Sequence, residues 1–253
     1  MDLGLKGKVA VVTGGTKGIG RGCCEALANE GANLVINYRS DPEGAENVAQ
    51  FIREKYGVEV LLVCGDASKE ETVDKIFDKA MEKYGTVDIV VNNAGAGFAK
   101  KDFENLTYED WISGQDNNLN GQFLMCHKYV KYWKGLGRGG HIVNIISKAC
   151  LMTNSINNQI YCSAKGGLMT LTRTLAHEVT KYGIYVNCVA PGYVQTERLY
   201  QPGSPEYERK KQFLKTGEYA KPRDIGNVVT FLCSRQARQI IGAVVDFTGG
   251  MLL

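Results

Sequence analysis

Short apolar runs alternate along the chain with amphipathic stretches. The runs are rich in β-branched residues and occupy positions 9–12, 34–36, 60–63, 89–91, 142–146, 184–186 and 243–245. Continuous runs of this kind are typical of strands buried on both faces of a parallel sheet. Helix-like segments lie between them, among them residues 21–30, 43–56, 69–84 and 161–182. The alternation predicts an α/β protein with a Rossmann-type doubly wound sheet of seven mainly parallel strands and helices on both faces.

The alternation extends over all 253 residues without a Pro/Ser-rich linker, a low-complexity tract or an internal repeat. Single α/β domains reach ~250 residues. We therefore expect residues 1–253 to form one domain. An apolar fraction of 44% and a charged fraction of 23% are ordinary for a globular protein.

Composition narrows the function classes. A net charge of +3 is too small to predict a nucleic-acid partner. The eight cysteines lack CxxC spacing and the three histidines form no HxxxH pair, so we expect reduced thiols and no metal site. The start lacks an apolar signal core, and no stretch approaches the ~20 apolar residues of a membrane span. These features predict a cytoplasmic protein without a membrane or nucleic-acid partner.

A glycine-rich loop, TGGTKGIG at residues 13–20, follows the first predicted strand and precedes a helix. Glycines let a backbone approach a pyrophosphate closely, and the helix N-terminus favours negative charge. A tight turn without a ligand is the alternative. The segment GLGRGG at 135–140 matches GxGxxG more literally, but it lies between a helix and a strand and is interpreted as a cap and turn. The predicted pyrophosphate contacts are Gly14, Thr16, Lys17, Gly18, Ile19 and Gly20.

The end of the second predicted strand favours NADP(H). Dinucleotide-binding folds usually place an acidic residue here for the ribose hydroxyls of NAD, or a basic one for the 2′-phosphate of NADP. This chain offers Asn37, Arg39 and Ser40 instead of a carboxylate, and Lys17 could reach the same phosphate. Asp41 lies close by, so NAD(H) remains possible if Asp41 rather than Arg39 faces the ribose.

A phenol and an ammonium stand four residues apart at Tyr161 and Lys165, which places them on one face of a helix. A nearby ammonium lowers the pKa of a phenol, which can then exchange a proton with an alcohol or carbonyl oxygen. Spacing alone does not identify the pair, because Tyr207 and Lys211 share it in a highly charged segment. Ser147, after the strand at 142–146, could hold the substrate oxygen or simply cap a turn.

Together these residues resemble the short-chain dehydrogenase/reductase family, in the branch of the 3-oxoacyl carrier-protein reductases and bacterial glucose dehydrogenases. The resemblance covers nearly the whole chain and includes the NNAG segment at 92–95 and the PGYVQT segment at 191–196. It implies that Lys165 binds the nicotinamide ribose, and that Asn118, rather than its neighbour Asn117, supports a proton relay through that lysine. It also implies a homotetramer, or a dimer. The further cofactor contacts that it implies are Asp66 and Ala67 at the adenine, Asn93 at the ribose, and Pro191, Val194 and Thr196 at the nicotinamide.

Two positions depart from the family pattern. Ser147 precedes Tyr161 by fourteen residues, whereas family members usually show thirteen, so Ser155 is a minor alternative. Lys148 stands directly after Ser147, where a small or apolar residue is more usual, and a cation there could attract an anionic substrate.

The sequence thus predicts an NADP(H)-dependent oxidoreductase that interconverts a secondary alcohol and a ketone, with Tyr161 as general acid/base. A 3-oxoacyl carrier-protein reductase and a non-catalytic NADP-sensing regulator are the alternatives. Residues about 198–217 match a substrate lid with a basic segment. The apolar residues expected in the pocket suit a bulky ketone, and they are Met152, Ile156, Ile160, Tyr193, Leu199 and Tyr200. The polar residues expected there suit a polyol, and they are Asn154, Asn157 and Asn158.

Overall fold

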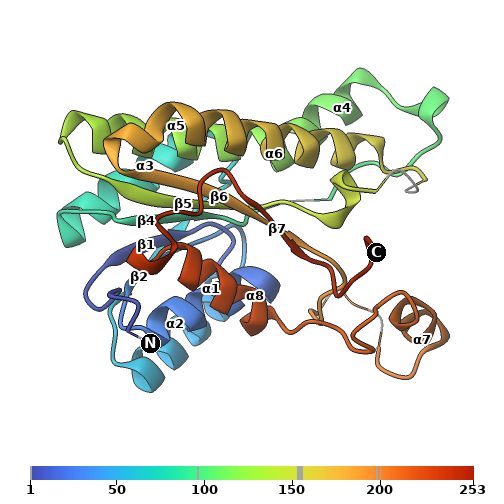
Figure 1. Cartoon of the computed structure of the whole chain (residues 1–253), viewed down its shortest axis with the longest axis horizontal. Coiled ribbons are helices and arrows are strands. Elements are labelled where there is room, and N and C mark those ends of the chain that lie inside the picture. Colours follow the sequence, from blue (N-terminus) through green and yellow to red (C-terminus); the bar gives the residue numbers. More distant parts are fainter. Residues whose placement is uncertain (1, 96, 153–155, 198, 200) are drawn as a thin grey trace.

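The computed structural model describes residues 2–95, 97–152, 156–197, 199 and 201–253 (Figure 1). The described residues form one seven-stranded sheet in the order β3-β2-β1-β4-β5-β6-β7, and every neighbouring pair is parallel. The fold class predicted from the alternation is therefore confirmed. The strands are β1 (Val9–Val12), β2 (Asn33–Tyr38), β3 (Val60–Cys64), β4 (Ile89–Asn92), β5 (Gly140–Ile145), β6 (Ile184–Pro191) and β7 (Val244–Phe247).

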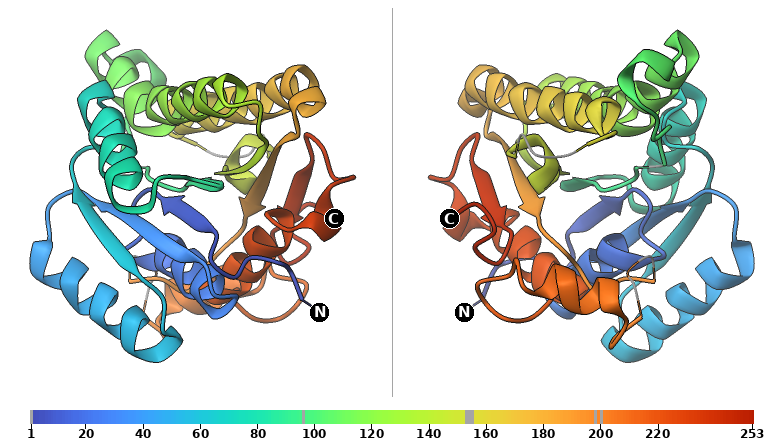
Figure 2. Two further views of the ribbon diagram at one scale, coloured as in Figure 1. Left: turned by 90° about the vertical axis from the view of Figure 1, so that its left-hand side faces the viewer. Right: turned by 90° about the vertical axis from the view of Figure 1, so that its right-hand side faces the viewer.

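Helices cover both faces of the sheet (Figure 2). One layer consists of α1 (Gly18–Asn29), α2 (Pro42–Tyr56) and α8 (Pro222–Leu232), and the other of α3 (Glu70–Tyr84), α5 (Gly121–Gly135) and α6 (Gln159–Val179). Successive residues of β1 serve the two layers in turn: Ala10 and Val12 pack with the first, Val9 and Val11 with the second. This two-sided burial explains why the strands are continuous apolar runs.

Long-range pairing sets the strand bounds that the apolar runs left open. β6 extends five residues beyond the predicted 184–186, because Cys188–Pro191 pair with β7. β5 begins at Gly140, which pairs with Ile184. Just before it, α5 ends at Gly135 and Gly137 adopts a φ of +62°, so the literal GxGxxG segment is a helix end and turn, as predicted.

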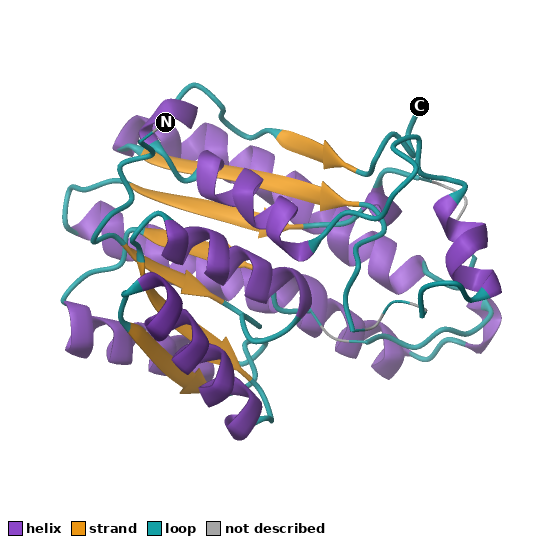
Figure 3. Cartoon of the chain, turned by 90° about the horizontal axis from the view of Figure 1, so that it is seen from below, coloured by secondary structure: helices purple, strands orange, loops and turns teal. Residues whose placement is uncertain are grey.

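The strand order places the crevice of the fold between β1 and β4. The chain moves outward from β1 to β3 and then returns to β4 on the other side of β1. Loops on either side of such a switch point diverge and leave room for a ligand at the carboxyl ends of the strands. All strand arrows point toward the same end of the molecule in Figure 3. Two helices lie beyond the main layers, α4 (Tyr108–Gln115) and α7 (Pro205–Lys211).

Candidate active site

A cleft of about 730 Å³ lies at the carboxyl edge of the sheet. Of the predicted catalytic and cofactor-binding residues, two do not line it. Gly20, the last residue of the glycine loop, is buried. Val194 is buried as well and pairs with Ala220. The predicted residues that line the cleft are Gly14, Thr16, Lys17, Gly18, Ile19, Arg39, Ser40, Asp66, Ala67, Asn93, Asn118, Ser147, Tyr161, Lys165, Pro191 and Thr196.

The glycine loop has the shape and polarity of an anion cradle. Gly14 adopts a φ of +61°, and a Cβ on Gly20 would lie 2.2 Å from the Gly14 carbonyl oxygen, so the loop needs glycine at both positions. The N-terminus of α1 has no side-chain cap and no acidic residue in its first turn. Its amide groups and the positive end of the helix dipole are therefore left for an anion. These residues fit the pyrophosphate of a dinucleotide.

Hydrogen bonds join this loop to the loop after β4. The Thr13 hydroxyl oxygen accepts from the amides of Asn93 at 3.1 Å and Ala94 at 3.0 Å. In return, Asn93 Nδ2 donates to the carbonyls of Thr13 at 3.0 Å and Gly14 at 3.1 Å. The Asn93 side chain therefore fixes the glycine loop in addition to lining the cleft. The sequence did not predict this role of the Thr13 hydroxyl. The only signal for it was the position of Thr13 between the strand and the first glycine.

Two polar residues near the predicted ribose site are engaged by the fold. Asn37 is buried, and its Nδ2 donates to the carbonyls of Val63 at 3.2 Å and Gly65 at 3.0 Å. Asp41 caps α2 by accepting from the Gly44 amide at 2.9 Å, and its other oxygen lies 2.6 Å from Lys17 Nζ. The Lys17 ammonium and the Gly44 amide lower the pKa of Asp41.

Arg39 and Ser40 stand at the rim of the cleft near Asp66. Burial by itself would raise the pKa of Asp66, but hydrogen bonds from Ser68 and the positive charges of Arg39 and Lys69 lower it overall. Asp66 Oδ1 accepts from the Ser68 amide at 3.0 Å. Among the described cleft-lining residues 13–68, the basic ones are Lys17 and Arg39. Lys17 is paired with Asp41, so Arg39 is the basic residue of this range that has no ion pair with Asp41.

The Tyr161 and Lys165 pair lies near the start of α6. The Lys165 side chain is 3% exposed, and its Nζ donates to the Ile145 carbonyl at 3.0 Å. Nζ lies 5.9 Å from the centre of the Tyr161 ring. Burial lowers the pKa of Lys165 to about 8. The Tyr161 ring stacks on Phe98 with 5.0 Å between ring centres, a contact that the sequence did not reveal.

Ser147 follows β5, caps a turn and also faces the cleft. It caps the short helix η3 (Lys148–Cys150), because its Oγ accepts from the Ala149 amide at 3.2 Å. It also lines the cleft. An accepting hydroxyl still has its own proton to donate, so the cap does not prevent Ser147 from binding a substrate oxygen. The alternative Ser155 lies outside the described residues, as does Asn154.

Asn118 lies in a π-helical turn, η2 (Asp116–Asn120), between α4 and α5. Its side chain is buried, and Nδ2 donates to the Gly114 carbonyl at 3.1 Å. A Cβ on Gly95 would lie 2.9 Å from Asn118 Oδ1 and 3.8 Å from Lys165 Nζ. The structure thus brings Asn118 close to Lys165, with a residue that lacks a side chain between them. Asn117 lines the cleft as well.

Several other residues considered in the sequence analysis do not line the cleft. Ile160 is buried against Gly114 in the core and is not a pocket wall, because it lies on the inner face of α6. Ile156 is 87% exposed. In α7, the Tyr207 carbonyl accepts from the Tyr219 hydroxyl at 2.6 Å, and neither Tyr207 nor Lys211 lines the cleft. Arg198 and Tyr200 lie outside the described residues.

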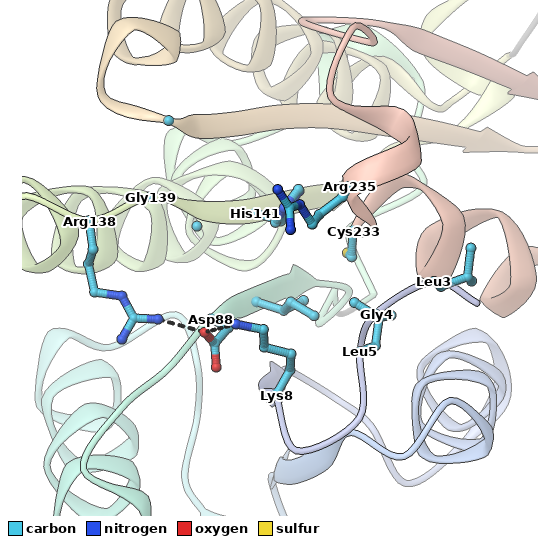
Figure 4. Close-up of a pocket in the computed structure, with 13 residues that line it drawn as sticks. Leu3, Gly4, Leu5, Lys8, Asp88, Arg138, Gly139, His141, Cys233 and Arg235 are labelled. Atoms are coloured by element: carbon cyan, nitrogen blue, oxygen red, sulfur yellow. Dashed lines mark hydrogen bonds and ion pairs between the residues drawn. The ribbon is translucent and has the colours of Figure 1, made fainter.

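A second cavity, of about 340 Å³, lies at the amino ends of the strands (Figure 4). Asp88 Oδ1 lies 3.2 Å from Lys8 Nζ and 2.6 Å from Arg138 Nη2, while Oδ2 accepts from the Val9 amide at 3.0 Å. The carboxylate is thus satisfied by groups of the fold, and this cluster ties β1, β4 and β5 together. Within the described ranges, no group of three or more His, Cys, Asp or Glu residues could hold a metal, and no helix is long and apolar enough to cross a membrane.

The arrangement agrees with that of known proteins. The family model described as enoyl-(acyl carrier protein) reductase matches residues 14–252. Glucose 1-dehydrogenase 2 of Bacillus subtilis is 35% identical over 98% of this chain and 96% of its own. The 3-oxoacyl-(acyl-carrier-protein) reductase of Aquifex aeolicus is 36% identical over 99% of this chain and its full length.

A solved structure shows the same fold. The L-sorbose reductase of Gluconobacter frateurii, complexed with NADPH and L-sorbose, superposes with a TM-score of 0.91 at 31% identity, covering 100% of this chain and 99% of its own. The seven-stranded parallel sheet, the family match over nearly the whole length and these relatives agree with one another. The chain belongs to the short-chain dehydrogenase/reductase family of oxidoreductases.

Proposed function

We propose that the protein is an NADP(H)-dependent oxidoreductase that interconverts a secondary alcohol and a ketone. One observation carries the proposal: Tyr161, Lys165 and Ser147 line the same cleft as the glycine loop. A proton-transfer group and a dinucleotide site must share one cavity if hydride and proton are to reach the same substrate. The shared cavity also favours an enzyme over the alternative of a non-catalytic NADP-sensing regulator.

The preference for NADP(H) is supported by the partners of Asp41. That carboxylate is occupied by the cap of α2 and by Lys17, so it is poorly placed to accept from ribose hydroxyls. Asn37 is likewise held by backbone carbonyls. Arg39 and Ser40 remain at the rim, where a guanidinium and a hydroxyl would bind the 2′-phosphate. The complex of L-sorbose reductase with NADPH supports a nicotinamide cofactor for this chain.

The remaining cofactor contacts are proposed residue by residue. Residues Gly14 to Gly20 would hold the pyrophosphate, with Gly20 allowing the loop to close rather than touching the ligand. The adenine would lie against Asp66 and Ala67, and the adjoining ribose near Asn93. Lys165 would bind the nicotinamide ribose. The carboxamide would lie at Pro191, Val194 and Thr196.

A bound nicotinamide supplies or accepts the hydride. Ser147 donates a hydrogen bond to the substrate oxygen and holds it beside Tyr161. Tyr161 gives its phenolic proton to that oxygen in the reductive direction and removes it in the oxidative direction. The positive charge of Lys165, whose Nζ lies 5.9 Å from the centre of the Tyr161 ring, stabilises the negative charge on the Tyr161 oxygen when that oxygen carries no proton. Asn118, next to Lys165, supports the return of the proton from solvent.

Residues about 198–217 form the lid of this proposed single-domain enzyme, and α7 is its helical part. Lids of this kind admit the substrate and then exclude water from the reacting groups. A homotetramer, or a dimer, is the proposed assembly.

The test compares two tyrosines that share the YxxxK spacing. Tyr161→Phe should lower ketone-dependent oxidation of NADPH by at least about 100-fold, because the phenolic proton is lost. NADPH binding, measured by fluorescence titration, should stay within about twofold, because a phenol hydrogen bond contributes little of a dinucleotide's affinity. Tyr207→Phe is the matched control and should keep both properties. Substantial turnover by Tyr161→Phe, or a wild-type protein that does not bind NADPH, would reject the proposal.

A further inference from the structure

A polar group beside Ser147 has no part in the mechanism above. It is formed by Lys148, Cys162 and Tyr193, which come from the loop after β5, from α6 and from the loop after β6. Each of them directly follows a residue that lines the cleft, namely Ser147, Tyr161 and Gly192 respectively. None of the three is itself among the lining residues, so the group adjoins the cleft beside the proposed reacting groups rather than forming its wall.

Two ammonium groups lie close to the aromatic ring of this group. Lys148 Nζ lies 4.6 Å from the centre of the Tyr193 ring and 3.8 Å from Met152 Sδ. Lys210, which belongs to α7 of the proposed lid, places its Nζ 5.1 Å from the same ring centre. Residues 148 and 210 are far apart in the sequence, so only the folded chain brings their charges together.

The Lys148 charge is poorly compensated by the protein itself. Burial and the Lys210 charge lower the pKa of Lys148, and the Cys162 thiol only partly opposes them. In the part of the chain that the structure describes, no carboxylate forms an ion pair with Lys148. A ring face and a thioether are weaker partners for a half-buried cation than an anion would be. An anionic ligand would therefore be stabilised here by both lysines.

We propose that Lys148 and Lys210 form a binding site for an anionic group of the substrate, a carboxylate or a phosphate. The carbonyl of the same molecule then lies between Ser147 and Tyr161. This inference rests on the proposed function and adds the substrate class: oxo acids or phosphorylated ketones, with the corresponding hydroxy compounds in the reverse direction. It distinguishes this chain from the relatives whose names refer to glucose and L-sorbose, which are uncharged.

The site also links α7 to the loop after β5. Lys148 is fixed beside the cleft, whereas Lys210 belongs to α7, and the anion would bind both. Because each contact is charge-assisted, substrate binding would offset the mutual repulsion of the two ammonium groups. The anion would thus hold α7 in its position beside the Tyr193 ring.

The experiment uses a graded set of substrates. The wild-type enzyme is supplied with NADPH and with 2-, 3-, 4- and 5-oxohexanoate, each beside its methyl ester, so that the distance from ketone to carboxylate increases by one bond at a time. Dihydroxyacetone phosphate beside dihydroxyacetone is the phosphate arm. For at least one pair, kcat/KM should favour the anion over its neutral counterpart by about tenfold or more, the size of a charge-assisted contact. The arm with the preference identifies carboxylate or phosphate as the ligand.

Three variants then locate the preference. Lys148→Gln and Lys210→Gln should each reduce the ratio of anion to neutral kcat/KM by about tenfold, mainly through KM, since the lost contact is a binding contact. Lys148→Arg keeps the charge and should retain most of the ratio. Arg209→Gln, at an exposed position of the same helix, is the matched control and should keep it fully. The ratio removes any general effect on folding or cofactor binding, because both members of a pair experience it.

Neutral counterparts that react as well as every anion, or a preference that survives Lys148→Gln, would overturn the inference while leaving the proposed function intact. A calorimetric titration of the oxohexanoates and their methyl esters into protein saturated with NADP⁺ measures binding independently of turnover, because no reduction can occur in that complex. Tighter binding of acid than ester, lost in Lys148→Gln, would support the site even if no ketone were turned over. Absence of any difference in that titration counts against it.

Discussion

The buried ammonium of Lys165 should cost the protein stability, and its removal provides a quantitative test. Lys165 is 3% exposed and its pKa is lowered by burial from 10.5 to about 8. At about 1.4 kcal/mol for each pKa unit, keeping the charged form in the folded state costs ~3 kcal/mol. Lys165→Met removes the charge and retains a side chain of similar length. It also removes the hydrogen bond to the Ile145 carbonyl, worth ~1 kcal/mol.

We therefore expect Lys165→Met to raise the free energy of unfolding by ~2 kcal/mol at about pH 7, while turnover is lost. The pH dependence follows from linkage. Between about pH 8 and pH 10.5 the unfolded chain binds more protons at this lysine than the folded one, so wild-type stability rises through that window. Below about pH 8 the destabilisation by Lys165 is constant, because both states then carry the proton. The advantage of the variant should accordingly shrink by ~2–3 kcal/mol on going to about pH 10.

Urea denaturation of the cofactor-free protein, at several pH values and protein concentrations, measures the stability difference between variant and wild type and its dependence on pH. Lys79→Met, at an exposed position of α3, is the control and should change stability by less than ~0.5 kcal/mol at every pH. A Lys165→Met protein less stable than the wild type near neutral pH would refute the reasoning, as would a stability difference independent of pH. Either result would mean that the folded protein stabilises this ammonium as well as water does.

Two further predictions concern the cofactor site. Arg39→Asp should shift the ratio of kcat/KM for NADPH over NADH toward NADH by about tenfold or more, because a cation facing the 2′-phosphate becomes an anion; an unchanged ratio would show that Arg39 does not bind it. Gly20→Ala should weaken NADPH binding by about tenfold or more, because its Cβ would lie 2.2 Å from the Gly14 oxygen and force the loop to move. Gly135→Ala, in the literal GxGxxG segment, meets no atom within 4 Å and should bind NADPH normally in the same fluorescence titration.

The order of elements made the fold and the place of the cleft predictable from the sequence. Apolar runs alternating with helices imply a parallel sheet, and parallel strands send their following loops to one edge. Gly14 and Ser147, which are far apart in the sequence, could therefore be assigned to one site without knowing any contact. The family resemblance added Asn93 to that site. The same order excluded the segment at 135–140 as a dinucleotide-binding loop and the pair at Tyr207 and Lys211 as the proton-transfer pair.

Partners across the fold could not be predicted in this way. The sequence did not show that the Asp41 side chain forms an ion pair with Lys17 while it caps α2. The periodicity of α6 did not show that Ile160 packs on Gly114 rather than lining the pocket. Both are questions of which way a side chain points, and a neighbouring element answers them.

The sequence by itself determined the fold class, the family and most of the residues at the carboxyl edge, because strand period and motif order are local properties of the chain. Only the tertiary structure decided that Asn93 holds the glycine loop, that Lys165 is buried with a lowered pKa, and that Lys148 and Lys210 share the Tyr193 ring. Burial and electrostatic interaction depend on atoms from distant segments. These contacts exist only after the chain has folded.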